Sequence, residues 1–127
     1  MIIDDNHMNL ELVSYMLDAG GFVVKMESGA ATALDSIPTF RPDLILMDIQ
    51  LPDMDGLELT QRLKGNPATA DIVIVAFTAY AMKGDEAKML AAGCDGYISK
   101  PINVATFVSQ VEACLSVPSS AGEPRIA

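Results

Sequence analysis

Hydrophobic and polar positions follow two different patterns, and segments of the two kinds alternate along the chain. Short apolar runs that end in polar residues are typical of β-strands, and they cover residues 1–3, 22–26, 43–47, 72–77 and 96–99. Between them, apolar residues recur every three or four positions, as in amphipathic helices, over residues 6–19, 29–37, 57–64, 84–92 and 103–115. Gly20-Gly21, Pro38, Gly65-Asn66-Pro67 and Gly93 separate these segments. The pattern predicts five strand–helix units.

This alternation determines the expected fold class. The runs at 43–47 and 72–77 are apolar throughout, which is typical of parallel strands covered on both faces. Strands that alternate with helices predict a doubly wound α/β domain, with a parallel sheet between two helical layers. We place this domain at residues 1–116. The tail at residues 117–127 has the composition of a linker, and we expect it to be disordered.

Ligands of such folds bind beyond the carboxyl ends of the strands, so the residues found there matter most. They are Asp4 and Asp5 after the first strand, Asp48 after the third, Thr78 after the fourth, and Lys100, followed by Pro101, after the fifth. Each alone has a common structural explanation, such as an acid that caps a helix. The ordered set is the stronger signal. If the first and third strands are neighbours, the three carboxylates meet.

Three adjacent carboxylates repel one another and raise one another's pKa values. A hard divalent cation removes this conflict, and Mg²⁺ prefers oxygen ligands and phosphate oxygens. Lys100 adds a fixed positive charge, and Thr78 adds a hydroxyl donor. Together these groups suit phosphoryl transfer to a carboxylate, which requires positioning and charge stabilisation.

Charge and composition narrow the possible partners and locations. Seventeen acidic residues against eight basic ones give a net charge of −9, which argues against binding to nucleic acid or anionic membranes. No apolar run approaches the roughly 20 residues that cross a bilayer, and no secretory signal is recognisable, so we expect a cytoplasmic location without membrane insertion. Cys94 and Cys114 have neither redox nor zinc spacing, so we expect reduced thiols.

Four motifs give the chain a specific resemblance. They are "IIDDN" at 2–6, "DLILMDIQLPDMDG" at 43–56, "IVAFTAYAM" at 74–82 and "GYISKP" at 96–101. With them the chain resembles, over residues 1 to about 116, the receiver domain of two-component response regulators, most of all receivers that stand alone or sit in hybrid kinases. The resemblance implies a flavodoxin-like (βα)5 fold with a five-stranded parallel sheet of order 2-1-3-4-5. One departure is the short segment before Asp4, where the family has a longer first strand.

The resemblance also implies a role for each matching residue. Asp48 is the expected phosphoacceptor, and a Mg²⁺ ion is expected on Asp5, Asp48 and the backbone carbonyl of Gln50, with Asp4 acting through water. Thr78 is expected to bind a phosphoryl oxygen, Lys100 to pair with the phosphoryl group, Pro101 to follow a cis peptide bond, and Tyr97 to turn inward on activation.

The implied function is that of a phosphoacceptor in a two-component phosphorelay. A histidine kinase or a histidine phosphotransfer protein supplies the phosphoryl group, and a protein target reads the fourth helix, the fifth strand and the fifth helix, around residues 79–89 and Tyr97. Such a domain is a signalling module rather than an enzyme, although it catalyses its own phosphorylation and slow dephosphorylation.

Three alternatives compete with this interpretation. A haloacid-dehalogenase-type phosphatase wants a second acid two residues after its nucleophile, where this chain has Gln50. A flavodoxin binds phosphate through a hydroxyl- and glycine-rich first loop, but here that loop begins Asp4-Asp5. A degenerate receiver could act only as a scaffold, and the intact set of five residues argues against it. We expect the single histidine, His7, to be a solvated residue at a helix start.

Overall fold

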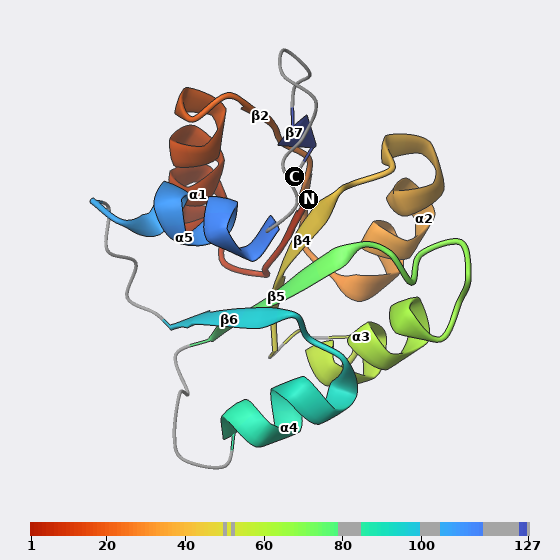
Figure 1. The fold of residues 1–127 in the computed structure, drawn as a ribbon. Helices are drawn as coiled ribbons and strands as arrows, with labels where there is room; N and C mark the ends of the chain where they lie inside the picture. The colour runs from red at the N-terminus through yellow and green to blue at the C-terminus, as the bar shows by residue number, and fades with distance from the viewer. Residues whose placement is uncertain (50, 52, 79–84, 100–104, 116–124, 127) are drawn as a thin grey trace.

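The computed structural model describes residues 1–49, 51, 53–78, 85–99, 105–115 and 125–126 (Figure 1). The described residues form a five-stranded parallel sheet of order β3-β1-β4-β5-β6. Its strands are β1 (Ile2–Ile3), β3 (Met26–Glu27), β4 (Leu44–Asp48), β5 (Val73–Thr78) and β6 (Gly96–Ser99). The helices are α1 (His7–Ala19), α2 (Ala30–Phe40), α3 (Gly56–Lys64), α4 (Asp85–Ala92) and α5 (Phe107–Leu115). If the five strands of this sheet are numbered in chain order, leaving out β2, their order is the predicted 2-1-3-4-5. The predicted fold class is therefore confirmed.

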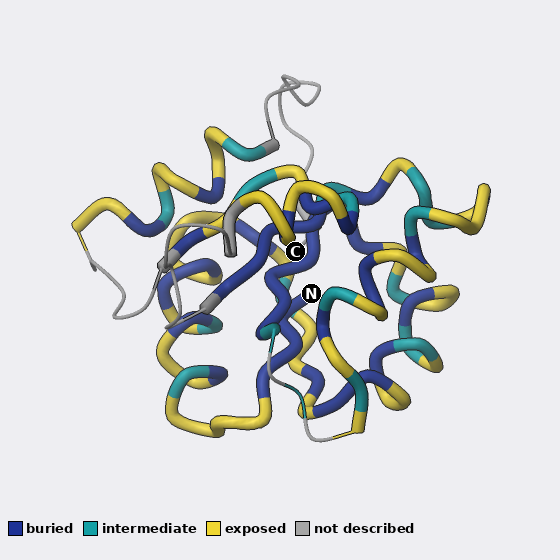
Figure 2. Tube along the Cα trace, turned by 90° about the horizontal axis from the view of Figure 1, so that it is seen from below, coloured by how far each residue is buried: buried dark blue, intermediate teal, exposed yellow. Residues whose placement is uncertain are grey.

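Helices cover both faces of the sheet. Side chains from α1 and α5 pack on one face, and side chains from α2, α3 and α4 pack on the other. Strand β4 shows how the sequence produces this arrangement, because Leu44 and Leu46 belong to the first core, whereas Ile45 and Met47 belong to the second. Figure 2 shows the result as buried strands through the centre and helices that alternate between buried and exposed residues.

The predicted strand at residues 22–26 is divided in the structure. Met26–Glu27 joins the main sheet as β3, whereas β2 (Phe22–Val23) lies outside it and pairs in parallel with β7 (Arg125–Ile126). Phe22 still packs into the core with α1. Strand β7 lies within residues 117–127. The domain boundary at residue 116 and the disordered tail stay predictions.

The prediction that Pro38 ends the second helix was wrong. Helix α2 contains Pro38 and continues to Phe40, and Arg41 ends it in the left-handed conformation with φ 52°. The N–H of Arg41 donates to the carbonyl of Ile37 at 2.8 Å. Proline removes one donor and disfavours the helix, but here it sits in the last turn, where this closing bond completes the helix beyond it.

A polar cluster on the side of α3 fixes the neighbouring strands. The ammonium group of Lys64 donates to the carbonyl of Ile72 and to Oδ2 of Asp95, at 2.8 Å each. The same oxygen of Asp95 accepts the N–H of Ile74 at 2.9 Å. These bonds join the end of α3 to the start of β5 and to the turn before β6. They therefore help to set the register in which Thr78 pairs with Ser99 at the far end.

Replacing Lys64 with Met should lower the free energy of unfolding by about 1–3 kcal/mol, because its charged hydrogen bonds to the partly buried carbonyl of Ile72 and to Asp95 are lost. The matched control is Arg62→Met on the same helix. Its pair with Glu58 is more than half exposed on both sides, so its loss should cost less than about 1 kcal/mol. Urea unfolding of both variants measures the difference. Equal losses would contradict a special role for Lys64.

Candidate active site

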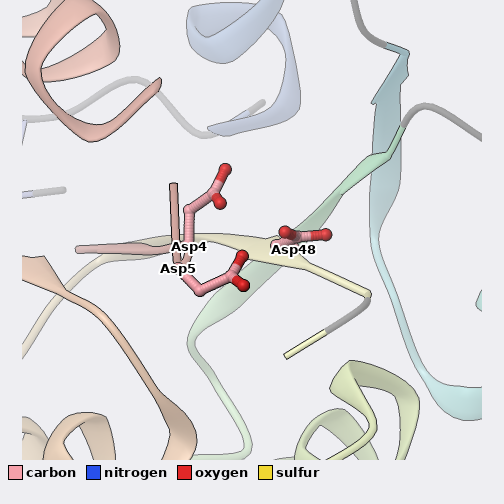
Figure 3. Close-up of side chains that lie close together, drawn as sticks. All are labelled: Asp4, Asp5 and Asp48. Carbon is pink, nitrogen blue, oxygen red and sulfur yellow. The ribbon is translucent and has the colours of Figure 1, made fainter. Parts of the chain in front are cut away.

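Three carboxylates lie together where β1 and β4 end. One oxygen each from Asp4, Asp5 and Asp48 lies within 4.8 Å of the others (Figure 3). The sheet register explains the meeting, because Ile3 of β1 pairs with Met47 of β4. Asp4 follows Ile3 and Asp48 follows Met47, so the two acids lie side by side at the ends of adjacent parallel strands.

The three acids differ in their surroundings. The side chain of Asp4 is fully buried, Asp48 is 7% exposed, and Asp5 is exposed. Oδ1 of Asp4 accepts the N–H of Asn6 at 2.9 Å, and Oδ2 accepts the amide of Asn9 at 3.4 Å. Hydrogen bonds of this kind offset the cost of burying a charge. Both oxygens of Asp4 are thus already used by protein donors, while Asp5 faces solvent.

Gly56, at the start of α3, lies close to the backbone at the end of β4. The N–H of Gly56 donates to the carbonyl of Ile49 at 2.8 Å. A Cβ at Gly56 would lie 2.5 Å from the carbonyl oxygen of Asp48, so only glycine fits there without a backbone shift. Asp55 then caps α3 by accepting the N–H of Leu57 at 2.8 Å.

A further acid in this loop, Asp53, contacts a different helix. Its two carboxylate oxygens accept the backbone N–H groups of Ala30 and Ala31, at 3.0 Å each. These hydrogen bonds lower the pKa of Asp53 from its ordinary value. Asp53 was not predicted as a site residue, and no local signal in the sequence marks it, because its partners are backbone groups 22 and 23 residues away.

The other predicted site residues lie at the same edge of the sheet or outside the described residues. Thr78 is the last residue of β5, directly after Phe77, which pairs with Asp48 across the sheet. Tyr97 lies on β6 opposite Ala76 and is 39% exposed. Gln50, Lys100 and Pro101 lie outside the described residues. The structure therefore brings together the three acids and places the backbone of Thr78 beside them.

The donor set of this cluster suits a hard divalent cation. It offers three carboxylates, whose oxygens are the ligands that Mg²⁺ takes, and one of the three faces solvent, from which such an ion would enter with its waters. A cation among them would also offset the repulsion between the carboxylates. The arrangement can hold a metal ion next to the buried carboxylate of Asp48.

Residues 1–112 match the response regulator receiver domain. The chain belongs to this family. The match covers the sheet, the acid cluster and most of α5, which confirms the predicted family. Membership also sets aside the phosphatase and flavodoxin alternatives. In the described segments, no helix is long and apolar enough to span a membrane.

Individual relatives support the assignment. The polar-differentiation response regulator DivK of Brucella anthropi is 44% identical to this receiver over 115 residues, which cover 91% of this chain and 94% of DivK. Chemotaxis response regulator CheY4 of Vibrio cholerae shares the fold, with a TM-score of 0.84 at 23% identity over 89% of this chain and 94% of CheY4. The receiver domain of sensor histidine kinase PA1611 from Pseudomonas aeruginosa PAO1 is 29% identical, with a TM-score of 0.81 over 91% of this chain and 95% of that one. It was solved with a magnesium ion coordinated in its active-site cleft.

Proposed function

We propose that this receiver accepts a phosphoryl group on Asp48 in a Mg²⁺-dependent reaction, in the cytoplasm, and signals through a change of its protein-binding surface. The observation that carries the proposal is the meeting of Asp4, Asp5 and Asp48 within 4.8 Å at the strand ends of a receiver domain. The proposed donor is a histidine kinase or a histidine phosphotransfer protein.

The proposed metal site has three direct protein ligands and one residue that acts through water. Asp5 and Asp48 would bind Mg²⁺ directly, with the backbone carbonyl of Gln50 as a third protein ligand. Asp4 would act through water, and its use of both oxygens for Asn6 and Asn9 supports this indirect role. When bound, the metal would neutralise charge on the carboxylates and on the phosphoryl oxygens.

The chemical step would be carried by the chain's own carboxylate. An oxygen of Asp48 attacks phosphorus, the bond from phosphorus to the donor's leaving atom breaks, and that atom takes the electron pair. Thr78 and Lys100 would hold the phosphoryl oxygens. Slow hydrolysis of the resulting acyl phosphate would return the domain to its starting state, so the module would catalyse both halves of its own cycle.

Incubation with acetyl phosphate and Mg²⁺ should add one phosphoryl group, seen by intact-mass spectrometry. The adduct should be absent in Asp48→Asn and strongly reduced by a chelator, because the nucleophile or the charge neutralisation is missing. Formation of the adduct in Asp48→Asn would refute the assignment of the acceptor. Failure of the wild type to react would favour the scaffold alternative.

Mg²⁺ should stabilise the fold, because an ion that binds only the native state shifts the folding equilibrium by mass action. At Mg²⁺ concentrations well above the Kd, the free energy of unfolding should rise by about 1–3 kcal/mol. Asp5→Asn should lose this response but unfold at a higher temperature than wild type without metal, because one repelling charge is gone. Thermal unfolding with Mg²⁺ and with chelator tests both effects.

The matched control for this experiment is Asp71→Asn. Asp71 is an exposed acid next to the opposite end of β5, so its loss changes the net charge equally without touching the cluster. It should keep the full Mg²⁺ response. An equal response in wild type and Asp5→Asn would contradict Asp5 as a ligand.

The surface proposed for the target is formed by α4, β6 and α5. Two large apolar residues stand exposed there, Leu90 at 53% and Tyr97 at 39%. Thr78 pairs with Ser99, two residues after Tyr97 on the same strand, so a shift of Thr78 toward a phosphoryl group would act next to it. A second exposed apolar set lies on α1, which begins two residues after Asp5, and consists of Met8, Leu12 and Tyr15. It is a candidate contact for the phosphodonor.

Beryllium fluoride, which mimics the phosphoryl group, should shift amide resonances of Tyr97 and α4 as well as those around Asp48. The physical reason is that the two states need differ by only a few kcal/mol, so a ligand at Asp48 can move the population. Asp48→Asn is the control and should show no shift. Changes confined to the acid cluster and Thr78 would show that no switch reaches the target surface.

A further inference from the structure

Helix α2 begins on a cap that its own sequence does not supply. Its N-cap residue is Gly29, which makes no side-chain hydrogen bond, whereas the first N–H groups of a helix need acceptors. Asp53 provides them from the loop before α3, with Oδ1 3.0 Å from the nitrogen of Ala30 and Oδ2 3.0 Å from that of Ala31. A carboxylate is also the side chain that the positive end of a helix favours.

Gly29 makes this contact possible by leaving space. A Cβ at Gly29 would lie 3.2 Å from Oδ1 and 3.3 Å from Oδ2 of Asp53, closer than most real Cβ contacts. Its φ of −161° is ordinary extended backbone, so any residue could adopt it. Glycine therefore serves here to admit the carboxylate, not to allow an unusual conformation.

The contact between Asp53 and α2 completes a closed series of neighbouring segments around the acid cluster, each joined to the next by hydrogen bonds or by the chain itself. Strand β1 pairs with β4 on one side, and on the other the N–H of Asp4 donates to the carbonyl of Glu27 at the end of β3, at 3.0 Å. Three residues after Glu27, α2 begins at Ala30, where Asp53 docks. From Asp53 the chain runs back five residues to Asp48. Each segment that contributes to the cluster is thus joined to its neighbours.

We propose that Asp53 is a positioning residue for the metal site: by docking on α2 it holds the described residues after Asp48, which are Ile49, Leu51 and Asp53–Asp55, close to Asp4 and Asp5. This inference rests on the proposed function. Mg²⁺ demands nearly ideal octahedral geometry, so the chain that follows the proposed ligand Asp48 must be restrained. Outer contacts that orient ligands typically matter by ten- to a hundredfold in metal affinity. The two backbone hydrogen bonds favour the charged carboxylate of Asp53 and so lower its pKa.

A simpler role would be that Asp53 only stabilises α2. The chain offers a variant that separates the two roles. In Asp53→Ala the space beside Gly29 is free, so Gly29→Ser can be added there without a clash. Serine at an N-cap with extended backbone accepts N–H groups of its own helix. The double variant Gly29→Ser/Asp53→Ala therefore restores a cap on α2 but not the link to the loop.

The experiment measures the Kd of Mg²⁺ by calorimetry and, without metal, the amide exchange of Ala31 and Gly56. Asp53→Ala should raise the Kd by roughly three- to tenfold, which is at or below the smallest change typical of groups that orient metal ligands. It should also speed the exchange of both amides. The double variant should restore protection at Ala31 while the Kd and the exchange at Gly56 stay raised. Glu58→Gln, which removes an exposed acid from α3, is the charge control and should leave the Kd within about twofold, because exposed charges are well screened.

A double variant with the Kd of wild type would reduce Asp53 to a helix cap and overturn the inference. The same holds if Asp53→Ala binds Mg²⁺ as tightly as wild type, or if Glu58→Gln weakens binding equally, since charge alone would then explain the loss. A wild-type protein that binds no Mg²⁺ would contradict the proposed metal site and the inference with it. That outcome is recognisable, because it is seen before any variant is compared.

Discussion

The parallel register of β1 against β4 is the constraint on which the site depends. It brings Asp4 and Asp48 out of the sheet side by side, and both are almost removed from water. Away from solvent, like charges repel more strongly than at a surface, because less water screens them. The hydrogen bonds to Asp4 offset its burial but leave the excess of negative charge in place. The metal-free site is therefore an electrostatic cost that the fold must carry.

Burial of apolar side chains in the core offsets this cost. All five residues of β4 are buried, and each fully buried Leu, Ile or Met contributes about 1.5–3 kcal/mol from its apolar surface. On the next strand Phe77 packs against Phe107 of α5 with ring centroids 6.2 Å apart. Close packing on both faces also keeps the strands from moving apart. The repulsion can then be relieved by a bound cation, and not by relaxation of the sheet.

The sequence predicted most of the fold and the acid cluster, because both follow from periodicity and from what succeeds each strand. Its errors lie where tertiary contacts override a local signal. Pro38 normally breaks a helix, but one closing hydrogen bond from Arg41 completes the last turn beyond it. The run at 22–26 satisfies strand propensity throughout, yet only its last residue joins the main sheet. Asp53 was missed because its partners are backbone groups, which leave no mark on the sequence.

The place where a signal can leave the domain follows from the same packing. Strands β4 and β5 each have a neighbour on both sides, so their central residues cannot shift without breaking ladder hydrogen bonds and core contacts. Strand β6 is at the edge and pairs only with β5 in the described sheet. Its residue Tyr97 is partly exposed, whereas its neighbour Ile98 is buried. Among the strands next to the acid cluster, the packing therefore leaves most freedom to a side chain on the exposed side of β6, where Tyr97 lies.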